Sequence, residues 1–218
     1  VKTTELGVSF ARNFDLGGSE ISVGITPKVV SVETIVVREN ITTISTGLRD
    51  LLDEDATKDL GEYTTLDIGF VYDYAEAIHV GIVGKNILEE EVKFTSQSGV
   101  PATLSFDSRW RAGVAYHNRL MMLGIDLDLV ENDPIVTGGA FSGLKTQMVS
   151  FGAEFNAFDF MQLRVGVMKN IASDIPGDLG NPFYTIGAGL WLGFVLDIAV
   201  VQGEGDSLGA FMQTGFKF

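Results

Sequence analysis

The chain has 218 residues, 26 glycines, 15 phenylalanines and no cysteine, and its formal net charge is -14 at pH 7. Without cysteine it has no disulfide framework, thiolate metal site or catalytic thiol. The negative charge, with no cluster of lysine and arginine to offset it, argues against nucleic-acid binding because phosphate is repelled by such a surface. The length suits one all-β domain covering 1–218.

In chain order, about eleven segments alternate apolar residues with small or polar ones, a period of two that is typical of β-strands. They are 6–11, 21–26, 65–72, 78–85, 106–116, 121–129, 149–155, 162–167, 184–192, 196–200 and 208–218. Where the second strand continues past 26, the alternation of apolar and polar residues breaks down near Val29–Val32. A bulge or an extension of the strand beyond a bilayer would explain this change. No segment favours a long helix, so the pattern predicts an all-β chain.

The longest apolar run, Ile186–Val201, could be mistaken for a membrane helix. It is shorter than the roughly 20 residues that a spanning helix needs, and it contains Asp197. Its period of two predicts two strands on either side of Gly193 instead.

The links between the predicted strands alternate in length. Short links at 15–18, 73–77, 117–118, 156–160 and 193 alternate with longer ones at 39–61, 88–103, 131–144, 172–181 and 202–206. Up-and-down outer-membrane barrels have short periplasmic turns and long outer loops. The alternation therefore favours an antiparallel up-and-down transmembrane β-barrel in the bacterial outer membrane over a soluble β-sandwich, the alternative that would have no reason to keep it.

The last strand supports the same interpretation, because it ends the sequence on aromatic residues. Leu208, Ala210, Met212, Thr214, Phe216 and Phe218 form one face. An apolar strand with an aromatic end resembles the closing strand of an outer-membrane barrel, which implies that Phe216 and Phe218 act as an assembly signal. That signal prefers glycine where this chain has Gln213, and the glycine here is Gly215.

In a membrane barrel the apolar side of each strand faces lipid and the other side lines the lumen. The predicted lumen-lining residues are Asp67, Lys85, Arg109, Arg111, Asp126, Asp128, Glu154, Arg164 and Asp197, and Asp107 shares their side of the pattern. A tight turn at His117–Asn118 would place Arg109 opposite Asp126 and Arg111 opposite Gly124. Glu154 is expected to reach Arg164 across the next hairpin. Such pairs lower the cost of placing charge in a partly wet interior; the alternative is a one-faced sheet with a solvated ladder of charges.

Strand direction predicts more strands than these eleven. If Phe218 lies at the periplasmic side, the first visible strand runs inward from the outer face, whereas a complete single-chain barrel has an even number of strands. We therefore expect 1–218 to be the carboxy-terminal part of a 12–14-stranded barrel, with its amino-terminal strands and any plug absent. No signal peptide is visible after Val1, so it was either removed or lies in the missing part.

Three short segments resemble hairpins of a known family: HVGIVGKNI at 79–87, RWRAGVAYHN at 109–118 and QLRVGVMKNI at 162–171. They are similar to the long-chain fatty-acid-transporter-like (FadL-like) barrels, and most of all to the branch of TraF-type conjugal-transfer-operon proteins. The resemblance implies about fourteen strands with an amino-terminal plug, and diffusion of hydrophobic compounds through the wall or lumen. No ligand-contact residue can be matched individually.

The longest link contains Ile44, Leu48, Leu51, Leu52 and Leu60 at helical spacing, behind Ser45 or Thr46 as an amino-terminal cap. A short amphipathic helix there could offer a hydrophobic ligand an apolar landing site, or it could simply pack on the base of its own loop. The long links also hold much of the acid, which is either solvated surface or a set of ligands for divalent cations shared with lipopolysaccharide.

Catalysis is not expected. His79 and His117 are the only histidines and lack metal-ligand spacing, and the GIVGK segment at 81–85 lacks the phosphate-loop pattern. The sequence predicts no cofactor and no metal. We expect passive transport of small hydrophobic molecules, or alternatively a structural or assembly role that anchors an envelope or conjugation machine. The expected partners are the lipid bilayer, lipopolysaccharide, the barrel assembly machinery and a hydrophobic small molecule.

Overall fold

The computed structural model of the chain describes residues 2–35, 57–95, 101–133, 136–137, 145–158, 160–173, 180–203 and 207–216. The described strands are β1 (Lys2–Gly7), β2 (Phe10–Asp15), β3 (Ser19–Ile35), β4 (Thr57–Tyr74), β5 (Ile78–Lys85), β6 (Glu90–Thr95), β7 (Pro101–Phe106), β8 (Arg109–His117), β9 (Met121–Asp128), β10 (Val136–Thr137), β11 (Met148–Phe158), β12 (Met161–Asn170), β13 (Phe183–Trp191), β14 (Phe194–Gln202) and β15 (Leu208–Phe216). In this part of the chain no helix is long and apolar enough to cross a membrane.

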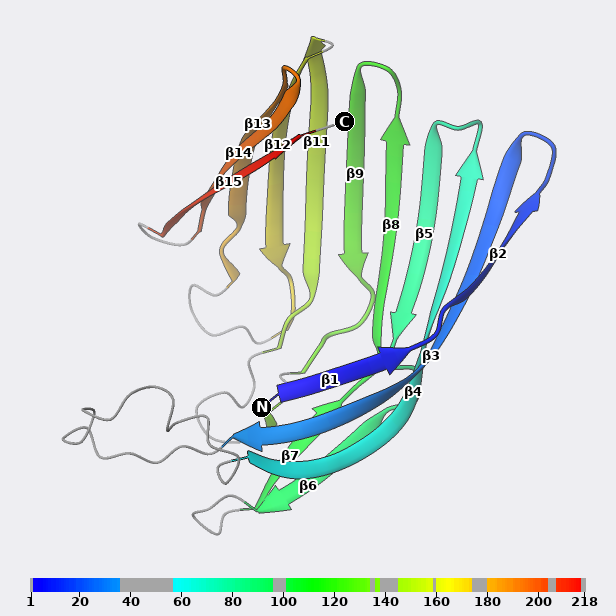
Figure 1. The fold of residues 1–218 in the computed structure, drawn as a ribbon, viewed down its shortest axis with the longest axis vertical. Coiled ribbons are helices and arrows are strands. Elements are labelled where there is room, and N and C mark those ends of the chain that lie inside the picture. The colour runs from blue at the N-terminus through cyan, green and yellow to red at the C-terminus, as the bar shows by residue number, and fades with distance from the viewer. Residues whose placement is uncertain are drawn as a thin grey trace.

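The main sheet is antiparallel and curled (Figure 1), with the order β1-β3-β4-β5-β8-β9-β11-β12-β13-β14-β15. β2 pairs with the same side of β3 as β1 does, so β1 and β2 occupy one strand position and the described sheet has eleven positions. Each position pairs with the next one along the chain. The predicted all-β, up-and-down fold of about eleven strands is confirmed.

The first predicted strand is broken into β1 and β2 at Val8 and Ser9. The registers of β1 and β2 on β3 are continuous, since Gly7 pairs with Lys28 and Phe10 pairs with Ile25. The break falls opposite Pro27, which has no amide hydrogen to donate to the ladder. The Val8 amide still donates to the Pro27 carbonyl at 3.1 Å, and the hydroxyls of Ser9 and Thr26 bond to each other at 2.9 Å.

The predicted alternation of short and long links is confirmed. The links after β2, β4, β8, β11 and β13 are short, and their ends lie together at the top of Figure 1. The apolar run Ile186–Val201 splits as predicted into β13 and β14 around Gly193, whose φ of 83° is a turn conformation that favours glycine. Because all the short links lie at one end, the strand ends that lead into the long links lie at the other.

The two faces of the sheet differ in chemistry. We call one the apolar face: it carries exposed side chains such as Phe151, Val165 and Ile186, whose exposed fractions are 41%, 51% and 63%. Arg12 in β2 lies on this face too, with its guanidinium 5.2 Å from the centre of the Phe14 ring. Exposure of this size shows that no layer of the described protein covers the apolar face.

A second sheet, β10-β7-β6, lies in segments that the sequence predicted to be loops. β7 and β6 occupy the predicted link at 88–103, and the short strand β10 lies in the link at 131–144. Figure 1 shows β6 and β7 beside the lower halves of β3 and β4, which extend beyond the other strands. The sequence pattern missed this sheet because its strands are short and weakly alternating.

The buried hydrophobic cluster that the described residues form joins the two sheets. It consists of Val30 and Val32 of β3, Tyr63 of β4, and Leu104 and Phe106 of β7. This explains the faltering phase near Val29–Val32: the strand keeps its alternation, but here the face opposite the apolar face becomes dry and hydrophobic because β7 covers it. The only register shift between β3 and β4 comes later, between Val32 and Glu33.

The two edges of the main sheet, β1/β2 and β15, do not pair with each other. They occupy the first and the eleventh of alternating positions and so run in the same direction, whereas every pairing in the sheet is antiparallel. The prediction that further strands belong to the barrel stays a prediction.

Candidate functional site

The nine predicted lumen-lining residues all lie on one face of the main sheet, which we call the charged face. They are Asp67, Lys85, Arg109, Arg111, Asp126, Asp128, Glu154, Arg164 and Asp197. Paired residues share a face, and the registers connect all nine through pairs such as Lys85 with Arg109, Arg111 with Asp128, and Glu154 with Arg164.

An ionic cluster crosses three strands of the charged face. The Nε of Arg164 in β12 donates to Glu154 in β11 at 2.7 Å, as the sequence predicted, and its Nη1 donates to Asp197 in β14 at 2.6 Å. Gln162 accepts a further bond from Nη2 of the same guanidinium at 2.7 Å. Since β13 separates β12 from β14, the contact with Asp197 shows that the sheet curls towards the charged face.

Gly189 of β13 makes room for that crossing contact. A Cβ at this position would lie 2.7 Å from Oδ1 of Asp197 and 3.5 Å from Nη2 of Arg164. A side chain there would therefore collide with the ion pair. The alternation pattern marked Gly189 as a small residue but gave no sign of this role.

The predicted pairing of Arg109 with Asp126 and of Arg111 with Gly124 is wrong, because the register of β8 against β9 differs by four residues from the predicted one. Arg111 pairs with Asp128 and donates from Nε to Oδ1 at 2.7 Å. The turn is longer than predicted, because the Asn118 side chain accepts bonds from the amides of Leu120 and Met121 at 2.8 and 2.9 Å. This side-chain turn shifts the whole hairpin register.

Lys28 is a buried cation that the sequence analysis missed. Its Nζ lies 3.1 Å from Glu5 and 3.1 Å from Asp67, and its side chain is 6% exposed. Asp67 also accepts a bond from the amide of Asn86 at 2.9 Å. Lys28 stands two residues after Thr26, the partner of Asp67, so its place on the charged face follows from the alternation.

Lys85 and Arg109 face each other in neighbouring strands, and neither has an ion-pair partner among the described residues. Asp107 stands just before β8 and accepts a bond from the Ser105 hydroxyl at 2.5 Å. Lys85 and Arg109 therefore place two positive charges, without ion-pair partners in the described part of the chain, on the charged face at the end of the sheet near the long links.

Near the short links, both histidines lie on the charged face. Nδ1 of His79 is 2.5 Å from Asp73, and the rings of His79 and His117 are 6.4 Å apart. They line a hollow of about 640 Å³ together with acidic residues that include Asp15 and Glu20. Within the described ranges, no group of three or more histidine or acidic residues is arranged to hold a metal ion.

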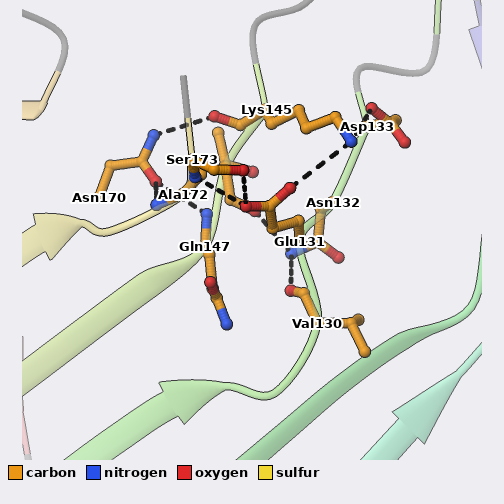
Figure 2. Close-up of polar contacts among 10 residues, drawn as sticks. Val130, Glu131, Asn132, Asp133, Lys145, Gln147, Asn170, Ala172 and Ser173 are labelled. Carbon is orange, nitrogen blue, oxygen red and sulfur yellow. Dashed lines mark hydrogen bonds and ion pairs between the residues drawn. The ribbon is translucent and has the colours of Figure 1, made fainter. Parts of the chain in front are cut away.

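At the other end of the sheet, polar side chains hold two long links together, the link between β9 and β11 and the link between β12 and β13. Figure 2 shows Glu131 between Ser173 and Lys145. Glu131 accepts bonds from the hydroxyl and the amide of Ser173, the latter at 2.7 Å, and lies 3.5 Å from Lys145, which is 3.6 Å from Asp133. We call these four residues the loop clasp.

Asn170, at the end of β12, bonds to the backbone of the segments beside the loop clasp. Its Oδ1 accepts bonds from the amides of Gln147 and Ala172 at 2.8 and 3.2 Å, and its Nδ2 donates to the Lys145 carbonyl at 3.0 Å. The sequence analysis placed acidic residues in these links, but the contacts join three segments far apart in sequence, and no local pattern reveals them.

The loop clasp is expected to loosen in acid. The Ser173 hydroxyl, the Ser173 amide and Lys145 hold the pKa of Glu131 below its ordinary value of 4.5. A lowered pKa means that the stabilisation is fully present above pH 4.5 and is lost as the pH falls through the lowered value. The protection factor of the Ser173 amide, measured by hydrogen exchange at pH 7 and pH 3, should fall in acid; in Glu131→Gln it should be low at both. Equal protection of the native chain at both pH values would contradict this.

Two sequence predictions lie outside the described residues. The proposed ligand-loop residues Ile44, Leu48, Leu51 and Leu52 fall in 36–56, and Phe218 of the assembly signal falls in 217–218. Phe216 is described: it pairs with Phe194 at the end of β15 and is 76% exposed.

Comparisons with known proteins were made on the whole chain. Residues 1–128 match the model of the family described as F plasmid transfer operon, TraF, protein. No curated protein matches. The chain is similar to the solved CymD monoaromatic hydrocarbon channel, with 14% identity over 97% of this chain and 71% of that one and a TM-score of 0.44. It is also similar to a mutant of Rh. blastica porin, with 11% identity over 99% and 91% and a TM-score of 0.41. Since the family model covers more than half of its residues, the chain belongs to the family of F plasmid transfer operon TraF proteins.

Proposed function

We propose that the chain forms the wall of an outer-membrane β-barrel through which small hydrophobic molecules pass by diffusion. The observation that carries the proposal is the contrast between the faces of one curled sheet. The apolar face exposes large side chains such as Phe151 and Ile186, while the charged face holds the cluster of Glu154, Arg164 and Asp197. Exposing the apolar face to water would cost free energy, whereas its contact with lipid acyl chains is favourable.

Strand length supports the same proposal. β8, β12, β13, β14 and β15 contain 9, 10, 9, 9 and 9 residues. A tilted strand of about 9–11 residues spans the apolar core of a bilayer. The five short links at one end and the long links at the other follow the pattern of periplasmic turns and outer loops.

Transport is tested by uptake of an uncharged apolar dye, 1-N-phenylnaphthylamine, into vesicles whose outer leaflet is lipopolysaccharide. We expect vesicles with the full-length protein to take up the dye several-fold faster than empty vesicles, because lipopolysaccharide slows apolar solutes that a protein path admits. Equal rates in the two kinds of vesicle would contradict the transport proposal. A sugar of similar size serves as the control for general leakage.

An anchoring role is the second candidate, and the loop clasp favours it. Glu131, Lys145 and Ser173 fix two long links into a common surface that an envelope or conjugation partner could recognise. If the protein passes no solute and copurifies with one stable partner that Glu131→Gln releases, this second role is supported.

The remaining partners follow from the membrane assignment. The apolar face would contact the lipid bilayer, the long links would meet lipopolysaccharide, and β15 with Phe216 would be read by the barrel assembly machinery. Divalent cations are a weaker proposal near the loop clasp, because Lys145 already neutralises part of the charge of Glu131 and Asp133.

A further inference from the structure

A hollow of about 550 Å³ lies over β9, β11, β12 and β13, and its floor on the charged face is a row of glycines. Gly124 pairs with Gly152, and Gly152 pairs with Gly166. A Cβ on Gly124 or Gly152 would meet nothing within 4 Å. Over Gly124 and Gly152 the floor is therefore bare backbone with free space above it, which a flat molecule can approach closely. At Gly166 the space is smaller, because a Cβ there would lie 2.6 Å from Oγ1 of Thr185.

The neighbouring rows give this hollow mostly apolar sides. On the side nearer the short links lies Met122, and on the side nearer the long links lie Met168 and Phe183, which pair with each other. The line of paired residues that contains the glycines continues through Thr185 and ends at Val201. Methionine and phenylalanine offer polarisable surface that suits aromatic rings. The volume lies within the range of small-molecule sites, which are mainly apolar with a few fixed polar groups.

The charges beside the hollow are predominantly negative. Glu154 and Arg164 line it, and Asp197 is bound to the same guanidinium. Asp126 lines it too and has no ion-pair partner among the described residues; the nearest cation on its neighbouring strand, Arg111, is held by Asp128. Two carboxylates, Asp126 and Glu154, therefore line the hollow, and its one guanidinium is already bonded to Glu154 and Asp197. A carboxylate ligand would meet repulsion and no free cation there.

We propose that this glycine-floored hollow is the subsite where the barrel holds uncharged, flat apolar molecules, and that its carboxylates reject carboxylate anions. This inference rests on the proposed transport function and names its substrate class. It separates the chain from a carrier selective for fatty-acid anions, which would need an unpaired cation at such a place.

The test compares two ligands of the same shape, 1-naphthol and the anion 1-naphthoate, by calorimetry on the full-length protein in nanodiscs at pH 7, with empty nanodiscs subtracted. We expect 1-naphthol to bind at least about tenfold more tightly than 1-naphthoate. Gly152→Leu, which fills free space without a backbone clash, should weaken 1-naphthol binding by a similar factor. Asp126→Asn should tighten 1-naphthoate binding, because it removes a carboxylate that repels the anion.

Gly69→Leu is the matched control, because it also adds a side chain to open space on the charged face but lies in β4, away from the hollow. It should leave 1-naphthol binding unchanged. Equal affinity for the two ligands, or binding that Gly152→Leu does not alter, would overturn the inference. Dye uptake distinguishes failure of the subsite from failure of the transport function. If the Gly152→Leu protein still takes up dye and its 1-naphthol binding is unaltered, only the subsite is refuted. If the native protein takes up no dye, the transport function itself is refuted.

Discussion

Replacing Leu104 by alanine is expected to destabilise the docking of the second sheet by about 2–4 kcal/mol. Leu104 of β7 is fully buried and belongs, with Val30 and Val32 of β3, to the one hydrophobic cluster that the described residues form. The substitution removes three carbon atoms from a site where rigid β-branched neighbours cannot collapse into the space. Because the cluster holds the second sheet and not the main one, the loss should be local.

The measurement is limited proteolysis of the folded protein, followed as the rate of cleavage within 86–108 at increasing urea. Leu104→Ala should be cut at lower urea than the native chain, while the heat-modifiable gel mobility of the barrel stays unchanged. Leu88→Ala is the matched control, since Leu88 lies in the same link but is 51% exposed. Equal cleavage of the Leu104 and Leu88 variants would contradict the role of this cluster.

Replacing Arg164 by methionine is expected to destabilise the folded barrel by about 1–2 kcal/mol. The change leaves Glu154 and Asp197 without their shared cation, and the two like charges then repel each other. Both carboxylates are about one quarter exposed and Arg164 is 40% exposed, so water screens part of the effect and the cost stays well below that of a dry ion pair.

Urea unfolding of the reconstituted protein measures this loss. Adding Glu154→Gln and Asp197→Asn to Arg164→Met removes the stranded charges and should recover most of the stability. Gly189→Leu tests the same cluster independently, because its side chain displaces Asp197 without deleting any charge. If the triple variant were no more stable than Arg164→Met, the ionic explanation would fail.

The main sheet could be predicted from the sequence because its rules are local. A period of two marks each strand, and the same alternation assigns every residue to a face, which is why the nine charged residues were grouped correctly on one side. The contact between Glu154 and Arg164, which are partners within one hairpin, also follows from local counting.

What the sequence did not reveal depends on contacts between distant segments. The register of Arg111 was misjudged because the side chain of Asn118 builds a longer turn. The contact of Arg164 with Asp197 needs a curled sheet and a glycine in the strand between them. Val30 and Val32 break the pattern only because a second sheet covers them, and nothing near them in the sequence says so.

The membrane assignment requires the apolar face of the sheet to meet lipid and the charged face to meet water. The cysteine-free chain allows single spin labels at Ser150→Cys and Phe151→Cys, neighbours in β11 that lie on the charged and the apolar face. Power-saturation EPR in bilayers should show the label at 151 accessible to oxygen and shielded from a water-soluble nickel chelate, and the label at 150 the reverse. A label at 151 that the nickel chelate reaches freely, with one at 150 in a dry environment, would contradict the membrane assignment.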